Sequence, residues 1–120
     1  MKAIYLADWS EVGRKGLVED FNHHGEAVDL TDGCEILLAY YSYEHYSGDA
    51  FVLFRKEGKL FEVNGGHCSC HGLEGQWEPE ETSVDALRHR MDKGQLGTGY
   101  GTGNMFAAEL RLVLDQVGEA

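Results

Sequence analysis

The sequence predicts an α+β fold, in which an antiparallel meander of three to four strands packs against two or three helices. A run rich in aliphatic and aromatic residues, between positions 35 and 63, is divided by short turn signals. Two later stretches repeat apolar residues at helical spacing. With 120 residues, 42% of them hydrophobic, the chain can build one ordinary core. We therefore expect a single domain spanning residues 1–120.

A first helix is expected from Ser10 to His24. Ser10 is a residue type that caps helix N-termini, although two glycines inside the stretch weaken it. The apolar side of this helix is formed by Leu17, Val18 and Phe21. A short alternating run over residues 26–30 then leads to a turn signal, Thr31-Asp32-Gly33.

Three strands are expected over residues 36–46, 50–56 and 59–63, which are rich in aliphatic and aromatic side chains. A turn at residues 47–49 would separate the first two. Gly58 suits the left-handed corner of a short hairpin between the second and the third. The glycines in residues 64–66 are expected to end the third strand in a sharp bend.

Two more helices are expected after the strands. Thr82 or Ser83 can cap the first of them, whose apolar face is formed by Val84, Leu87 and Met91. The second covers about residues 104–117, and its apolar stripe comprises Phe106, Leu110, Val113 and Val117, widened by Met105, Leu112 and Leu114. The glycine-rich residues 97–103 between these helices are expected to form a flexible connection.

The chain is strongly acidic. It has 21 aspartates and glutamates against 10 lysines and arginines, which gives a formal net charge of −11. This charge repels phosphate backbones and anionic lipids, so we expect no direct binding to nucleic acid or to a membrane. The same field attracts basic proteins and speeds their association. Solubility alone is the alternative explanation.

Cysteine usage and hydropathy indicate the compartment. The chain has three cysteines, an odd number, and Cys68 and Cys70 are too close together for an ordinary disulfide framework. No stretch is long and apolar enough to span a membrane, and charge interrupts the first residues too early for a signal peptide. We therefore expect reduced thiols and a cytoplasmic protein.

Four potential metal ligands lie in five residues: His67, Cys68, Cys70 and His71. Zinc accepts both thiolate and imidazole, so a small zinc-binding domain is one hypothesis, although a closed site needs ligands from elsewhere as well. A thiol-dependent enzyme is a second hypothesis, but neighbouring residues on a strand point to opposite faces, and we assign no catalytic residue. A third hypothesis is that the thiols of Cys68 and Cys70 are buried and have no chemical role.

An acidic stretch surrounds a tryptophan in the next segment. Its members are Glu74, Glu78, Glu80, Glu81 and Asp85, placed around Trp77 and Pro79. Such a run is commonly a solvated loop whose last members meet a helix N-terminus. An indole among carboxylates is also a suitable spot for binding a partner, and we take these five carboxylates and Trp77 as the candidate partner-binding residues.

Residues 59–82 read KLFEVNGGHCSCHGLEGQWEPEET. This segment resembles small proteins of tailed bacteriophages and prophages that have no assigned function. The resemblance covers the middle of the chain and implies a phage protein made in the cytoplasm of a bacterial host. By analogy, we expect an acidic inhibitor or modulator of a basic, nucleic-acid-binding host protein, such as a defence complex. Zinc binding and a thiol-dependent enzyme remain the alternatives, and the oligomeric state stays open.

Overall fold

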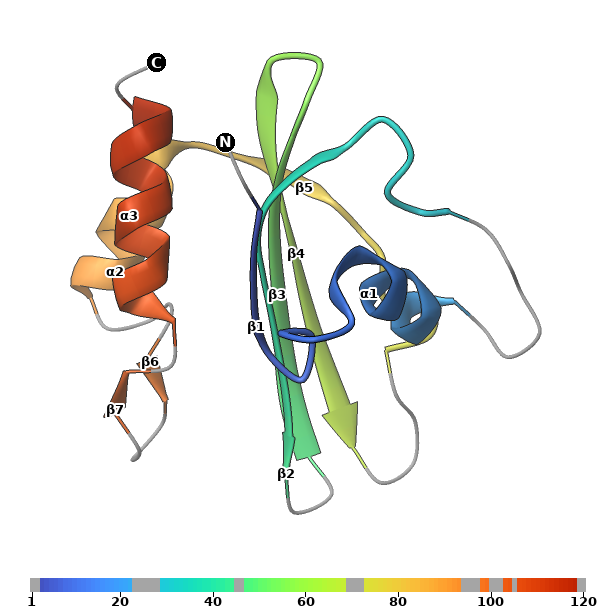
Figure 1. Ribbon diagram of the computed structural model, residues 1–120. Coiled ribbons are helices and arrows are strands. Elements are labelled where there is room, and N and C mark those ends of the chain that lie inside the picture. The colour runs from blue at the N-terminus through green and yellow to red at the C-terminus, as the bar shows by residue number, and fades with distance from the viewer. Residues whose placement is uncertain are drawn as a thin grey trace. The chain divides into compact units, whose positions relative to one another are not determined.

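The computed structural model describes residues 3–22, 29–44, 47–68, 73–93, 98–99, 103–104 and 106–118. The fold is α+β, with a five-stranded, mostly antiparallel sheet and three helices, as the sequence predicted (Figure 1). The chain divides into two compact units, Met1–Glu81 and Thr82–Ala120, which we describe separately. The expectation of a single domain stays a prediction.

The first unit is built on the sheet, whose strands lie side by side in chain order. The strands are β1 (Ile4–Ala7), β2 (Glu35–Glu44), β3 (Ser47–Lys56), β4 (Lys59–Cys68) and β5 (Glu80–Thr82), the last of which reaches into the first residue of the second unit. The antiparallel meander β2-β3-β4 confirms the expected core of the fold. Strand β1, which pairs in parallel with β2, was not predicted from the sequence.

Two expected turns are wrong. Residues 47–49 belong to β3, and β4 continues through the glycines to Cys68, with Gly65 opposite Ala50. A Cβ atom at Gly65 would lie only 3.1 Å from Cδ2 of Leu73, so this glycine permits a close approach of the chain and does not bend it. The hairpin at Gly58 is confirmed, because Glu57 and Gly58 both have positive φ angles, of 53° and 81°.

Helix α1 (Gly13–Phe21) is shorter than expected. Its N-cap is Val12 and not Ser10, and Val12 makes no side-chain capping bond. Ser10 lies in the preceding turn, where its backbone N–H donates to Ala7 O. Gly13 has a φ of +58°, a conformation that favours glycine and sets where the helix begins.

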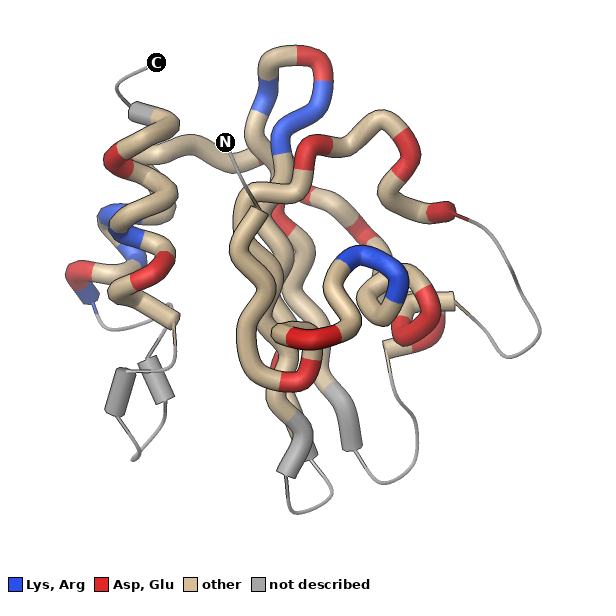
Figure 2. Tube along the Cα trace, in the orientation of Figure 1, with Lys and Arg blue, Asp and Glu red and all other residues tan. Residues whose placement is uncertain are grey.

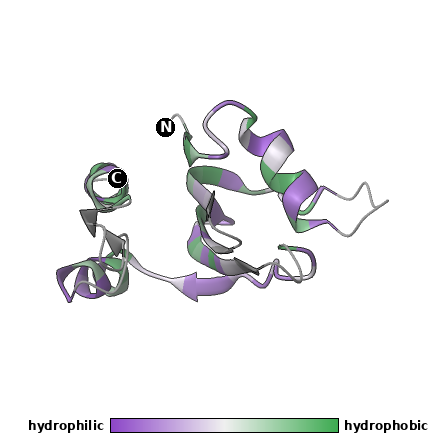
Figure 3. Cartoon of the chain, turned by 90° about the horizontal axis from the view of Figure 1, so that it is seen from below, coloured by the Kyte–Doolittle hydropathy of each residue, from purple (hydrophilic) through white to green (hydrophobic). Residues whose placement is uncertain are grey.

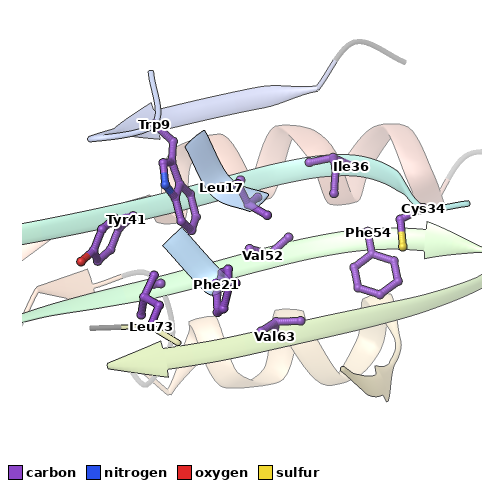
Figure 4. Close-up of a cluster of buried hydrophobic side chains, with 12 residues drawn as sticks. Trp9, Leu17, Phe21, Cys34, Ile36, Tyr41, Val52, Phe54, Val63 and Leu73 are labelled. Atoms are coloured by element: carbon purple, nitrogen blue, oxygen red, sulfur yellow. The ribbon is translucent and has the colours of Figure 1, made fainter. Parts of the chain in front are cut away.

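The core of the first unit lies between α1 and one face of the sheet (Figures 1 and 4). Leu17 and Phe21 of α1 are buried, as their spacing predicted. The cluster extends along the strands from Trp9 and Tyr41 at one end to Cys34 and Phe54 at the other (Figure 4). Coloured by hydropathy, the short strand β5 is hydrophilic (Figure 3).

The second unit contains α2 (Val84–Asp92), α3 (Ala107–Gly118) and the two-residue strands β6 (Thr98–Gly99) and β7 (Gly103–Asn104). Ser83 is the N-cap of α2, since its hydroxyl accepts a hydrogen bond from Ala86 N at 3.1 Å. The expected stripe of α3 is wrong at Leu112, which is 58% exposed. Within the glycine-rich segment, the described residues pair as β6 and β7 and are more than a bare connection.

No helix in the described part of the chain is both long enough and apolar enough to cross a membrane.

Candidate functional site

The segment Leu73–Glu81 is held against the sheet of the first unit by side chains that point inward. Leu73 is 1% exposed and belongs to the core cluster. The Gln76 amide donates to Gly66 O at 2.7 Å and accepts from Gly66 N at 2.8 Å. This pair of bonds satisfies the backbone of β4 as a neighbouring strand would, and it fixes the position of the segment.

Trp77 lies where this segment meets the aromatic part of the core. Its ring is stacked on Phe54, with centroids 5.7 Å apart and planes 12° apart, and it meets Phe21 edge-on at 5.2 Å. The side chain is half-buried. Trp77 therefore anchors the segment to the core and still presents part of its ring to solvent.

The carboxylates around Trp77 face the other way. Glu74, Glu78, Glu80 and Glu81 are all exposed, and we call these four the acidic segment. None of the four has an ion-pair partner among the residues that the structure describes. The 28 residues from Leu60 to Leu87 contain no lysine or arginine, so no cation lies near these carboxylates in the sequence.

Asp85 was predicted as a member of the same site, but it belongs to the second unit. It lies in the first turn of α2, where a negative charge favourably meets the positive end of the helix dipole. That Asp85 takes part in the same contact stays a prediction, and the acidic segment as defined above comprises the other four carboxylates.

Charge differs sharply between the two units. Residues 1–81 contain sixteen acidic and six basic residues, a net charge of −10, whereas residues 82–120 contain five and four, a net charge of −1. In the described part of the first unit, the cations are confined to two places, α1 and the β3–β4 hairpin (Figure 2). The surplus negative charge thus belongs to the unit that carries the acidic segment.

The turn that precedes β2 is fixed by a small polar network. Arg14 of α1 donates from Nε to the Thr31 hydroxyl at 2.6 Å and from Nη2 to the Thr31 carbonyl. The Thr31 hydroxyl and backbone N–H in turn donate to the Asp29 carboxylate. These two hydrogen bonds from Thr31 hold the pKa of Asp29 below its usual range.

The same turn carries Cys34, a free and buried cysteine. Burial raises the pKa of its thiol, so Cys34 stays protonated at neutral pH. No motif surrounds this cysteine, and its neighbours Phe54 and Lys56 come from a distant strand. Only the fold brings these residues together.

The predicted metal-ligand cluster lies outside what the structure describes. His67 and Cys68 are in β4, but their side chains are not described, and Cys70 and His71 fall outside the described residues altogether. Among the side chains that are described, no three of His, Cys, Asp or Glu gather as a potential metal site. The zinc and thiol-enzyme hypotheses for this cluster stay predictions.

Compared with known proteins, the chain matches no protein-family model, and no curated protein or solved structure matches it significantly.

Proposed function

We propose that this chain binds a protein with a basic surface, and that the acidic segment with Trp77 forms the contact. The observation that carries the proposal is the arrangement at residues 73–81. Four exposed carboxylates that make no ion pair with a described residue lie beside a half-buried tryptophan, in a unit of net charge −10.

The contact would be preorganised. The Gln76 bonds to Gly66 and the stack of Trp77 on Phe54 already fix the segment in the free protein. Little further ordering is then needed on binding, which favours affinity. The carboxylates steer a cationic partner and raise its association rate, whereas the exposed part of the Trp77 ring supplies an apolar anchor.

The class of partner follows from the charge. A protein that binds nucleic acid presents cationic side chains spaced to meet phosphates, and a group of exposed carboxylates can occupy the same surface. In the setting implied by the resemblance to phage proteins, this partner is a host protein, such as a defence complex, which the chain inhibits by covering its nucleic-acid site.

The test begins with capture of partners from bacterial lysate at low and at high salt, followed by binding kinetics with the purified partner. The variant Glu74→Gln/Glu78→Gln/Glu80→Gln/Glu81→Gln removes the acidic segment. We expect its association rate constant to fall about tenfold or more at low salt, because steering by close charges is lost.

A matched variant separates position from total charge. Asp8, Glu11, Glu19 and Asp49 are also exposed, and their replacement by Asn or Gln changes the net charge by the same four units. We expect a much smaller loss of association rate for this control. Equal losses in both variants, or a partner whose affinity is indifferent to salt, would contradict the proposed contact.

A further inference from the structure

A cavity of about 170 Å³ lies within the first unit. It is open to solvent and is lined by three segments: the turn before β2, the β3–β4 hairpin with its flanking strands, and the chain at Trp77 and Pro79. Phe54 and Lys56 are two residues apart on β3, so both side chains point to the face of the sheet that carries the core. The cavity therefore lies at the Cys34 and Phe54 end of the core cluster (Figure 4).

Three of the seven described residues that line it are aromatic. Phe61 is stacked on Phe54, with centroids 5.4 Å apart and planes 19° apart, and Trp77 is stacked on Phe54 with planes 12° apart. Phe54 is 2% exposed, whereas Phe61 and Trp77 are only half-buried. The rings of Phe61 and Trp77 thus keep free surface against which another flat ring can pack.

Of the described residues that line the cavity, Lys56 alone is charged. Its side chain passes over the turn at Gly33, where a Cβ atom would lie 3.4 Å from Lys56 Cε. Lys56 makes no ion pair with any described residue, although its unit is strongly acidic. The ammonium group is therefore available to an anion at this cavity.

The remaining polar group in the wall does not oppose an anion. Cys34 is 7% exposed, and because burial raises the pKa of its thiol, this group is neutral at physiological pH. A neutral thiol in an apolar wall packs as a small hydrophobic side chain. The cavity thus combines three aromatic lining residues with one positive charge, and the Asp29 and Asp32 carboxylates lie near enough to Cys34 to act on its thiol.

We propose that this cavity binds a small aromatic carboxylate with a single ring, which packs against Phe61 and Trp77 while its carboxylate pairs with Lys56. The volume of the cavity agrees with a ligand of one ring, because an apolar cavity of roughly 150 Å³ is sufficient to hold benzene. Since the cavity holds one ring and one charge, affinity is modest, with a Kd on the order of 1 mM. This site shares the Trp77 ring with the partner contact proposed above, but its test uses the protein without a partner.

The test uses three probes of the same shape and different charge: benzoate, neutral benzamide and cationic benzamidine. Each is titrated into the full-length protein at neutral pH and about 0.1 M salt. Two-dimensional NMR follows the indole N–H of Trp77 and the amides of Cys34 and Phe61. We expect saturable shifts at these signals with benzoate, and about tenfold weaker binding of benzamide, since the charge-assisted bond to Lys56 is lost.

Lys56→Met should weaken benzoate binding about tenfold and bring it level with benzamide. Lys59→Met is the matched control, because Lys59 is the register partner of Lys56, is likewise exposed and does not line the cavity. The proposal is overturned if benzoate gives no saturable shift up to about 20 mM. It is also overturned if Lys59→Met weakens benzoate as much as Lys56→Met, or if benzamidine binds most tightly, which would assign the cavity to a cationic side chain of a protein partner.

Discussion

The two units of this chain differ in their net charge and in how far their charged residues are paired. The second unit nearly balances them, with a net charge of −1, and uses them within its helices. Arg88 of α2 pairs with Asp115 of α3 at 2.8 Å, and Asp85 meets the N-terminus of α2. The first unit has a net charge of −10, and its acidic segment has no partner among the described residues.

This difference indicates that the fold of the first unit depends little on its surplus of negative charge. The fold there uses a few carboxylates, such as Asp20 for the Trp9 indole, Asp29 for Thr31 and Glu35 for Arg55. Its stability comes instead from the apolar cluster between α1 and the sheet. Carboxylates that do not serve the fold are free to act on a partner, and substitutions can test this separation.

The largest effect is expected in the core. Leu17 of α1 is fully buried, so Leu17→Ala should lower the free energy of unfolding by about 2–5 kcal/mol. Leu112→Ala is a chemically identical change at a residue that is 58% exposed, and it should cost less than about 0.5 kcal/mol. Urea denaturation of both variants gives the comparison. A small loss at Leu17 would mean that the first unit does not depend on this core.

The next effect tests a polar contact that the first unit does need. Arg14→Met removes both donors to Thr31, which is fully buried, and leaves its carbonyl without that partner. The expected loss is about 1–3 kcal/mol of unfolding free energy. Lys15→Met removes a neighbouring exposed cation and should be close to neutral. Equal effects of the two substitutions would show that only the charge matters.

Local signals in the sequence were sufficient to predict those elements of the fold that depend on neighbouring residues. The meander, the hairpin at Gly58 and the cap at Ser83 all follow from residues within a few positions of one another. The parallel strand β1 did not follow, because its partner β2 lies about thirty residues away and four residues carry little pattern. The bend predicted at Gly65 was wrong for a similar reason, since the contact with Leu73 that requires a glycine there is made by the fold.

The candidate sites also differ in whether neighbouring residues or only the fold bring their members together. The acidic segment lies within one short stretch, so the sequence alone indicated its four carboxylates. The cavity joins Cys34, Lys56 and Trp77 from three separate segments, and no spacing in the sequence connects them. Asp85 was grouped with the acidic segment because it is close in sequence, although it belongs to the other unit.

A single hydrogen bond in the second unit is expected to have a smaller effect. Ser83→Ala removes the side-chain acceptor of Ala86 N at the start of α2 and should cost about 1 kcal/mol. Ser10→Ala is the control, because Ser10 is exposed and does not cap α1. Thermal or urea unfolding of the two variants distinguishes them. A larger loss for Ser10→Ala would contradict the capping described here.

Low pH should lower the free energy of unfolding of the first unit, in part through Asp29. Thr31 donates to its carboxylate and lowers its pKa in the folded state, so the ionised form stabilises the fold. This contribution is fully present above the unfolded-state pKa of about 3.9 and is lost as the pH falls through the lower, folded-state pKa. Asp29→Asn should therefore lose less stability than the wild type between neutral pH and about pH 3. An identical pH dependence in urea denaturation would contradict this contribution.

The smallest effect on stability should come from the residues with the largest proposed effect on binding. Neutralising Glu74, Glu78, Glu80 and Glu81 together breaks no ion pair with a described residue and reduces repulsion within a unit of net charge −10. The free energy of unfolding should change by no more than about 0.5 kcal/mol, and towards higher stability. Urea denaturation beside the binding kinetics measures both quantities on one variant. Marked destabilisation would show that the fold itself uses these carboxylates, and a loss of binding in this variant would then no longer indicate a contact with a partner.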